Sequence, residues 1–375
     1  MTDIEYMRQA LELALKGTGW VNPNPLVGAV IVKEGRVIGS GYHKGYGELH
    51  AERDALRNCT ESPEGADIYV TLEPCCHYGK TPPCTDAIIE SGIRKVFIGS
   101  DDPNPKVAGK GIGILRNHGI EVQTGVLQTE CYEINQVFFH YIKNCRPYVI
   151  MKYAMTMDGK IATCSGKSKW ITGEAARHRV HQDRHRYMGI MVGVGTVLAD
   201  DPSLDCRLPQ SKNPVRIICD THLRTPLTAK VVQTSKQQQT ILATCCCDLQ
   251  KQQPYLDAGC EVVVLPQKEE HIDLPELMNR LGQKGLDSIL LEGGSTLNWA
   301  AMQSGIVNQV QTYLAPKLFG GADAKSPVGG MGVAAPDEAF CLSPPQITVL
   351  GPDILLESRV IEREVSTCLP ELSKK

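Results

Sequence analysis

The residues of this chain best suited to chemistry are one imidazole, two thiols and one carboxylate. His50-Ala51-Glu52 is followed along the chain by Cys75 and then by Cys84. A zinc ion that activates water keeps three protein ligands of this kind and leaves its fourth position open. A carboxylate that is not a ligand can move protons at the same centre. We therefore predict a zinc site with His50, Cys75 and Cys84 as ligands and Glu52 as the acid/base residue.

The spacing of the two thiols departs from the general form of this motif. Zinc nucleobase deaminases carry H-x-E together with P-C-x-x-C, whereas Cys76 to Pro83 separate Cys75 from Cys84 here. We interpret the added residues as a loop between ligands, in which His77 and Lys80 can reach a substrate phosphate or ring. The alternatives are a structural zinc site, with Cys76 or His77 as fourth ligand, or a His50 that serves only as a core histidine.

The residues of this motif must be positioned by the starts of helices. Residues two apart on a helix do not face each other, so His50 and Glu52 can converge only where the chain enters a helix. We predict helices over 51–58 and 84–91, the second of them preceded by Pro82-Pro83, which a helix start tolerates. The partial positive charge at helix N-termini favours thiolates, and we expect all three ligands to approach through such ends.

Length and composition narrow the class of protein. A chain of 375 residues is long enough for two domains. A net charge of −3 and 5% aromatic residues offer neither a basic nor a stacking surface for nucleic acid. The amino terminus lacks the features of a signal peptide, and no apolar run is long enough to span a membrane. We expect a cytoplasmic protein with mostly reduced thiols and with no nucleic-acid or membrane partner.

Hydrophobic periodicity divides the chain into two α/β parts. Residues 4–16 predict an amphipathic helix, and residues 27–41 predict a hairpin that turns at Gly35, followed by alternating strands and helices. A second series of strands begins after Arg146-Pro147, with mainly parallel pairing in its middle part. We therefore predict two α/β domains, 1–145 and 146–375.

Glycine-containing turns are the chemical landmarks of the second part. Gly193 to Thr196 and Glu292 to Ser295 each follow a predicted strand, and there the backbone can approach a pyrophosphate closely. The polar turn Ser168 to Gly173 opens a helix, where free N–H groups can meet a phosphate. Ordinary turns and an ordinary helix cap remain open as alternatives. Neither glycine turn is G-x-G-x-x-G, so the pattern does not support a Rossmann fold.

Taken together, the motifs resemble a known family. Pro23 to Gly28, Gly41-Tyr42-His43, His50-Ala51-Glu52, Val70 to Cys84 and Asp101 to Pro105 closely resemble the bifunctional deaminase/reductase of riboflavin biosynthesis, whose usual motif has the longer thiol spacing. The similarity covers essentially the whole chain. It implies a cytidine-deaminase-like three-layer domain followed by a dihydrofolate-reductase-like domain that binds NADPH.

This resemblance implies an activity for each domain. The first would deaminate 2,5-diamino-6-ribosylamino-4(3H)-pyrimidinone 5′-phosphate with the help of zinc. The second would reduce the ribosyl group with NADPH to give 5-amino-6-ribitylaminouracil 5′-phosphate. We therefore expect a phosphorylated pyrimidine as the small-molecule substrate, and a homo-oligomer.

The resemblance also implies site residues. Asn24, His43, His77 and Lys80 correspond to positions around the substrate of deamination. The positions around the substrate of reduction are Ser168, Arg184, Leu204, Arg207 and Glu292. The NADPH positions are Ala154, Trp170, Thr196, Asp200, Thr221, Gly294, Ser295, Thr296, Leu297, Asn298, Trp299 and Ala300.

Reduction of the sugar also needs proton donors and a phosphate clamp. Lys152, Asp200 and Glu292 are the candidates for proton transfer, and Arg184 and Arg207 are the candidates for the phosphate. We expect the rest of the basic segment 177–186 to be a solvated helix face.

Two other functions are compatible with the zinc motif. A nucleoside or nucleic-acid base deaminase with an accessory nucleotide-binding domain would leave the second part of the chain without a clear purpose. A zinc-stabilised nucleotide-binding regulator would bind ligand but would produce neither ammonia nor NADP+.

Overall fold

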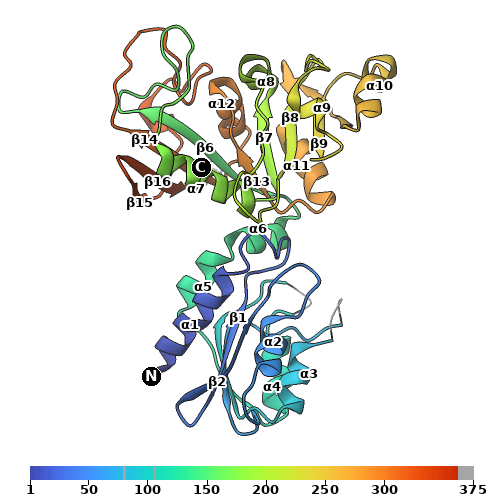
Figure 1. Ribbon diagram of the computed structural model, residues 1–375, viewed down its shortest axis with the longest axis vertical. Coiled ribbons are helices and arrows are strands. Elements are labelled where there is room, and N and C mark those ends of the chain that lie inside the picture. Colours follow the sequence, from blue (N-terminus) through green and yellow to red (C-terminus); the bar gives the residue numbers. More distant parts are fainter. Residues whose placement is uncertain (79–81, 105–106, 362–375) are drawn as a thin grey trace, which may run out of the picture.

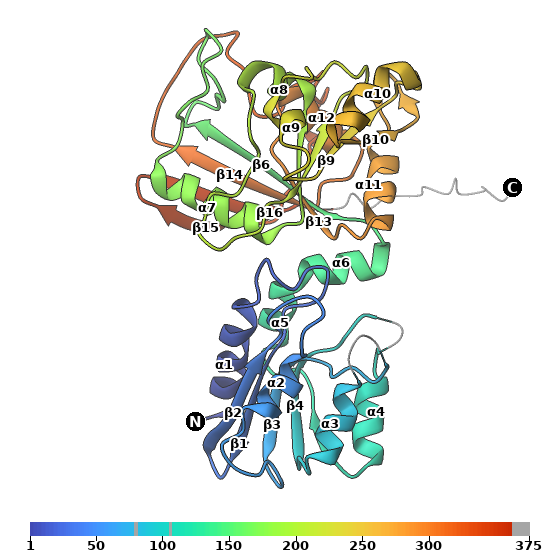
Figure 2. The ribbon, with the colours of Figure 1, turned by 45° about the vertical axis from the view of Figure 1, so that its right-hand side comes forward.

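The computed structural model describes residues 1–78, 82–104 and 107–361. They form two lobes, with helix α6 between them in both views (Figures 1 and 2). The first lobe contains a five-stranded sheet and the second a nine-stranded sheet, each covered by helices, with a separate two-stranded ribbon, β11-β12, in the second. The expected α/β fold class is confirmed.

Six helices and five strands of the described residues make up the first lobe. The helices are α1 (Asp3–Leu15), α2 (Ala51–Arg57), α3 (Cys84–Glu90), α4 (Lys110–Asn117), α5 (Gln128–Ile134) and α6 (Gln136–Asn144). The strands are β1 (Gly28–Lys33), β2 (Arg36–Tyr42), β3 (Asp67–Leu72), β4 (Lys95–Ser100) and β5 (Glu121–Gln123). The predicted first helix and hairpin are present, whereas α5 and α6 were not predicted individually.

The second lobe begins with β6. Its strands are β6 (Tyr148–Thr156), β7 (Gly189–Gly193), β8 (Val215–Cys219), β9 (Thr240–Thr244), β10 (Glu261–Val264), β11 (Gln267–Lys268), β12 (His271–Ile272), β13 (Ser288–Leu291), β14 (Gln309–Ala315), β15 (Gln346–Leu350) and β16 (Asp353–Arg359). The helices are α7 (Glu174–Arg186), α8 (Val194–Asp200), α9 (Lys230–Gln233), α10 (Leu249–Ala258), α11 (Leu274–Gln283), α12 (Ser295–Gln303) and the 3₁₀ turn η1 (Pro336–Glu338).

The order of strands in the first sheet, β2-β1-β3-β4-β5, brings several loops to one edge. Strand β1 runs antiparallel to both β2 and β3, while β3, β4 and β5 are parallel. The start of β1 therefore lies at the same edge as the ends of β2, β3 and β4. The loops that carry Asn24, His43, Cys75 and Asp102 begin or end there.

Helices pack on both faces of this sheet. Helix α1 begins at a capping box, in which Thr2 and Glu5 bond to each other's backbone, and it covers one face through Met7, Ala10 and Leu11. Gly28 permits its close approach, because a Cβ there would lie 2.0 Å from the Ala10 carbonyl oxygen. The other face packs against α2, α3 and α4 through Ala55, Ile88 and Leu115, among others.

The second sheet has the order β10-β9-β8-β7-β13-β6-β14-β16-β15. In this spatial order, neighbouring strands run parallel from β10 through β6 to β14, as predicted for the middle part of this domain. Strand β16 runs antiparallel to β14, and β15 runs antiparallel to β16. Apolar clusters fill both faces of the parallel part. The carboxyl ends of β6, β13, β7 and β8 thus lie in a row, which is where α/β sheets bind ligands. Within the described residues, no helix is long and apolar enough to cross a membrane.

The interpretation of residues 177–186 as a solvated helix face was wrong. These residues belong to α7, where Arg179 pairs with buried Asp183 at 3.3 Å and with Glu357 of β16 at 3.4 Å. The His185 ring lies edge-on to Trp20 of the first lobe, with ring centroids 4.9 Å apart. His178 and Gln182 are exposed, but the arginines of the segment are half-buried, because the helix contacts both the sheet of its own lobe and the first lobe. A single helical pattern does not reveal these contacts.

Candidate active sites

The structure brings His50, Cys75 and Cys84 together in the first lobe. The His50 Nδ1 atom lies 3.4 Å from each of the two Sγ atoms, and all three ligand atoms lie within 4.8 Å of one another. One nitrogen and two sulfur donors form a set suited to zinc, with a fourth position left for water. Among the described residues, this is the only such group of His, Cys, Asp or Glu side chains.

Two helix starts position these ligands. His50 is the N-cap of α2 and Cys84 is the first residue of α3, after Pro83 at the N-cap. Cys75 lies in the loop after β3, which corresponds to the strand predicted over 68–71. Its sulfur accepts the backbone N–H of Cys84 at 3.3 Å. Hydrogen bonds from Cys84 and from His50 lower the pKa of the Cys75 thiol to about 4, so a thiolate is favoured there.

Arg53, which sequence reasoning missed, connects the two helix starts. It lies on α2, and its guanidinium donates to the carbonyl oxygens of Pro82, at 3.2 Å, and Pro83, at 2.7 Å. These carbonyls directly precede Cys84. Arg53 therefore fixes the approach of one thiol relative to the helix that begins at His50.

Glu52 lies beside the three ligands and is only 3% exposed. Its carboxyl group lies against the Cys84 thiol. Burial, together with the nearby Cys75 thiolate, raises the pKa of Glu52 to about 7. A carboxyl group with this pKa can both accept and release a proton near neutral pH.

A cavity of about 320 Å³ opens beside Glu52 and the three-ligand cluster. This volume is in the range of small-molecule sites. Its walls include Asn24, His43 and His77, which were predicted to surround a substrate, and Phe138, Tyr141 and Ile142 of α6. The buried Nδ1 atom of His77 has no hydrogen-bond partner within the described residues, so it remains available to a ligand. Lys80 lies outside the described residues.

Asn24 and His43 form a defined pair in this cavity. His43 Nδ1 lies 2.9 Å from the Leu49 carbonyl oxygen, which can only accept, so Nδ1 carries the proton. The Nε2 atom of His43 then accepts from the Asn24 amide at 3.1 Å. Burial lowers the pKa of His43, which keeps the ring neutral.

Asp102 also lines the cavity, although sequence reasoning did not assign it to the site. It follows β4, the parallel neighbour of β3, and its Oδ1 accepts the Asn104 N–H at 2.8 Å. Burial raises the pKa of Asp102 to about 6, although that hydrogen bond opposes the shift. The signal that could have found it is topological, since neighbouring parallel strands end at the same edge.

In the second lobe, Lys152, Glu292 and Arg184 form a charged cluster. Leu291 of β13 pairs with Met151 of β6, and this register puts the next residues, Glu292 and Lys152, side by side. Their charged atoms lie 3.6 Å apart. Burial alone would raise the pKa of Glu292, but the charges of Arg184 and Lys152 outweigh it and lower that pKa to about 2.

The other residues predicted for the reduction site lie outside this cluster. Asp200 ends α8 and is exposed, and in the described part of the chain no hydrogen bond or ion pair joins it to Lys152 or Glu292. Arg207 has a 60% exposed side chain that pairs with Asp205 at 3.2 Å. Leu204 is buried at 3% exposure, so it contributes packing more than surface. Ser168 is half-buried.

Glycines open the helices that follow two adjacent strands. Gly193 is the N-cap of α8 after β7, and Gly294 is the N-cap of α12 after β13. A Cβ on Gly294 would have Thr196 Oγ1 at 3.9 Å as its nearest neighbour, so open space lies before this helix. Asn298 lies in α12, and its buried Oδ1 atom has no hydrogen-bond partner within the described residues. These features fit a nucleotide whose phosphates meet backbone N–H groups.

The remaining predicted cofactor positions are partly or fully accessible. Trp170 is 63% exposed, with the Arg177 guanidinium 4.7 Å from its ring centroid. Thr296 is exposed, and the other residues of this set are half-buried: Ala154, Thr196, Thr221, Ser295, Leu297, Trp299 and Ala300.

The polar turn Ser168 to Gly173 fits the alternative interpretation, an ordinary helix cap. The backbone N–H of Gly173 at the start of α7 donates to the Asp353 carboxylate at 2.6 Å. A carboxylate at this helix start disfavours a phosphate there by charge repulsion.

A zinc-binding hydrolytic lobe joined to a nucleotide-binding α/β lobe is the class of protein that this geometry defines. Comparisons with known proteins agree. A family model described as the cytidine and deoxycytidylate deaminase zinc-binding region matches residues 1–100, and one described as the RibD C-terminal domain matches residues 147–356. The chain belongs to the RibD family of riboflavin biosynthesis proteins. It is a zinc-dependent deaminase and an NADPH-dependent reductase.

Individual relatives cover nearly the whole chain. The riboflavin biosynthesis protein RibD of Actinobacillus pleuropneumoniae is 56% identical over 361 residues, covering 96% of each chain. That of Escherichia coli K12 is 37% identical over 369 residues, covering 95% of this chain and 99% of its own.

Solved structures show the same arrangement. Acinetobacter baumannii RibD, form 1, superposes with a TM-score of 0.87 at 36% identity, covering 96% of this chain and 99% of its own. A diaminohydroxyphosphoribosylaminopyrimidine deaminase/5-amino-6-(5-phosphoribosylamino)uracil reductase from Thermotoga maritima gives a TM-score of 0.83 at 39% identity with the same coverage.

Proposed function

We propose that this enzyme deaminates 2,5-diamino-6-ribosylamino-4(3H)-pyrimidinone 5′-phosphate and then reduces the ribosyl group of the product with NADPH. The observation that supports this most directly is the cluster of His50, Cys75 and Cys84 beside buried Glu52, at the wall of a cavity large enough for a pyrimidine. The name of the Thermotoga maritima structure points to the same substrate.

In the deaminase site, His50, Cys75 and Cys84 would hold zinc, which supplies an activated water when bound. Glu52 would take a proton from that water and pass it to the departing ammonia. Asn24 and His43 would orient the ring, because their side chains already form a fixed hydrogen-bonded pair in the cavity wall. His77 and Lys80 would contact the ring or the phosphate.

In the reductase site, NADPH would supply the hydride. We assign the cofactor to the open N-terminus of α12 and to the neighbouring carboxyl ends of β7 and β8, in agreement with the predicted cofactor positions. Arg207 is the better phosphate ligand of the two predicted arginines, since its guanidinium is exposed, whereas that of Arg184 is bound to Glu292.

Proton delivery to the sugar would fall to Lys152, held by Glu292. Asp200 is less suited to this role, because it is exposed at the end of α8 and makes no contact with the pair within the described residues.

We also propose the domain division 1–145 and 146–375. The boundary falls between the end of α6 and the start of β6. Residues 146–375 alone should oxidise NADPH with the deaminated substrate. A folded but inactive fragment would contradict this division.

A homo-oligomer in the cytoplasm completes the proposal. Strand β15 is an edge of the large sheet, and its Ile347 and Val349 are 62% and 71% exposed. An exposed apolar edge strand is suited to pairing with a second copy.

A coupled assay tests the function. Ammonia release is measured with and without NADPH, on the diaminopyrimidine phosphate and on cytidine, together with zinc content. We expect ammonia from the first substrate only, and NADPH oxidation that follows ammonia release. Release from cytidine would favour a nucleoside deaminase, and tight ligand binding without turnover would favour a regulator.

A further inference from the structure

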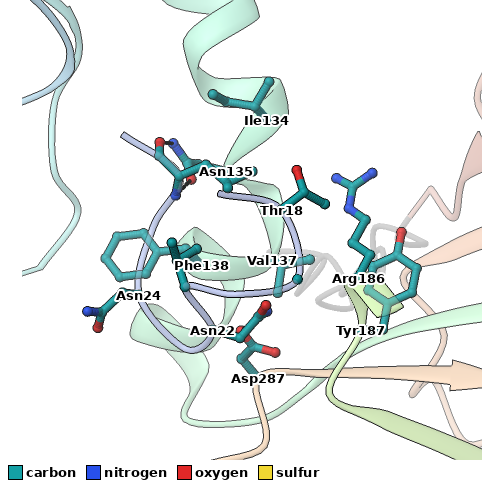
Figure 3. A pocket seen from close by; sticks show the side chains of 13 residues that line it. Thr18, Asn22, Asn24, Ile134, Asn135, Val137, Phe138, Arg186, Tyr187 and Asp287 are labelled. Carbon is teal, nitrogen blue, oxygen red and sulfur yellow. Dashed lines mark hydrogen bonds between the residues drawn. The ribbon is translucent and has the colours of Figure 1, made fainter. Parts of the chain in front are cut away.

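The loop from Thr18 to Leu26 contacts the second lobe at Trp20, whose ring lies edge-on to His185, and at a hydrogen bond of Asn22. The side-chain amide of Asn22 donates to Asp287 Oδ2 at 2.7 Å. Figure 3 shows these two side chains meeting where the loop faces the start of β13. Asp287 is only 2% exposed, and its other oxygen accepts the Ser288 hydroxyl at 2.5 Å. The contact therefore joins a loop of the first lobe to a buried carboxyl of the second.

Asp287 is a rigid acceptor. Its backbone carbonyl accepts the Tyr148 N–H at 2.7 Å, which fixes it at the start of the central strands β6 and β13. Ser288, its neighbour, also accepts the Met188 N–H at 3.1 Å. Any group bonded to the Asp287 side chain thus takes its position from the second sheet.

A small cavity adjoins the loop at this point. This cavity of about 30 Å³ lies between the lobes, lined by Asn22, Asn135 and Arg186 among others (Figure 3). A space of this size holds about two water molecules. Val21 and Leu26 of the loop pack into an apolar cluster with Ala14, whereas Asn22 and Asn24 between them are held by side-chain hydrogen bonds.

Three residues of the loop, Asn22, Asn24 and Leu26, are tied to other elements by side-chain hydrogen bonds. Leu26 is bonded through its N–H and carbonyl to the Asn135 side chain, at 2.8 and 2.9 Å. Asn24 is bonded to His43 at 3.1 Å and lines the deaminase cavity. The third contact, Asn22 to Asp287, is the only one of these three that comes from the second lobe.

Other contacts also hold the two lobes together. Tyr141 of α6 donates to the Gly282 carbonyl at 3.0 Å, and Arg359 pairs with Glu133 at 3.2 Å. The distinctive property of Asp287 is that its partner, Asn22, directly precedes Pro23 and Asn24, which both line the deaminase cavity.

We propose that Asp287, although it belongs to the reductase lobe, is a positioning residue for deamination. Through Asn22 it fixes the loop that presents Asn24 to the substrate. The inference rests on the proposed role of Asn24 as a substrate contact.

The test uses full-length protein with the variants Asn22→Ala, Asp287→Ala, Asp287→Asn and the double variant Asn22→Ala/Asp287→Ala. Loss of one hydrogen bond should raise the KM of deamination roughly three- to tenfold in either alanine variant. The double variant should be no worse than Asp287→Ala alone, because both changes remove the same bond. Asp287→Asn keeps an acceptor and should restore the KM. Zinc content, and kcat and KM for reduction in Asn22→Ala, should not change.

Arg359→Ala is the matched control, because it removes a contact between the lobes that does not involve the loop. It should leave the KM of deamination unchanged. An unchanged KM in Asn22→Ala, an equal loss of both activities, additive effects in the double variant, or an Asp287→Asn as impaired as Asp287→Ala would each overturn the proposal.

Asn24→Ala separates this proposal from the one on which it rests. If Asn24→Ala deaminates normally, the role of Asn24 is wrong and the reason for the inference is lost with it. If Asn24→Ala is impaired while Asn22→Ala is not, Asn24 keeps its role and the positioning by Asp287 is refuted.

Discussion

Arg184 donates two hydrogen bonds to Glu292, from Nε to Oε1 at 2.8 Å and from Nη2 to Oε2 at 3.0 Å. Lys152 approaches the same carboxylate at 3.6 Å. Two cations around one half-buried anion form a fixed unit at the carboxyl end of β13. Arg184 is therefore a ligand of Glu292 in this structure, so its predicted contact with a phosphate would have to compete with that ion pair.

This unit should make stability depend on pH. The Glu292 pKa is lowered to about 2 from an ordinary value of 4.5, so its ionised form stabilises the fold above pH 4.5, and that contribution is lost as the pH falls through 2. Glu292→Gln should lower the free energy of unfolding by about 3 kcal/mol at pH 7. The difference in unfolding free energy between the variant and the wild type should become smaller below pH 4.5.

Urea unfolding between pH 7 and pH 3, which enters the window below pH 4.5, measures this effect. Glu12→Gln, which changes an exposed carboxylate on α1, is the control and should change stability little at any pH. A Glu292→Gln deficit that grows on acidification would contradict the assigned direction of the pKa shift.

Glu52→Gln should separate metal binding from proton transfer. The amide keeps the size of the buried side chain but cannot carry a proton between water and ammonia. We expect zinc to remain bound and ammonia release to fall by roughly 10²- to 10⁴-fold. Zinc analysis and an ammonia assay measure the two quantities. An active variant would rule out the role assigned to Glu52.

Arg53→Ala should weaken the metal site without removing a ligand. Loss of the bonds to the Pro82 and Pro83 carbonyls frees the segment before Cys84, and we expect zinc affinity to fall roughly 10- to 100-fold. Competition with a chelator measures this. Arg57 lies on the same helix and pairs with Asp54 at 3.1 Å, so Arg57→Ala should bind zinc normally. Equal affinities in the two variants would refute the role of Arg53.

Gly294→Val should impair cofactor binding without unfolding the protein. The position has ordinary backbone angles, φ −81° and ψ 174°, and open space around its missing Cβ, so a side chain fits there. It would, however, occupy the space before α12 that the phosphates need. We expect the Kd for NADP+, measured by calorimetry, to rise at least about tenfold, or 1.4 kcal/mol. Gly113→Ala, in the open on α4, is the control. Unchanged binding in Gly294→Val would place the cofactor elsewhere.

The sequence by itself determined the donor set and the elements that carry it. His50 and Glu52 had to stand at a helix start, and proline before Cys84 indicated a second one, because helical spacing and proline chemistry are local properties. The two α/β parts and the parallel middle of the second sheet followed from local periodicity in the same way.

Tertiary structure decided everything that depends on which strands become neighbours. Asp102 enters the deaminase cavity only because β4 lies beside β3, and Lys152 meets Glu292 only through the register of β6 against β13. The contact of His185 on α7 with Trp20 and the bond from Asn22 to Asp287 depend on how the lobes pack together. These residues are far apart in the chain, and strand order, register and lobe packing are global results of burying apolar surface that no local pattern encodes.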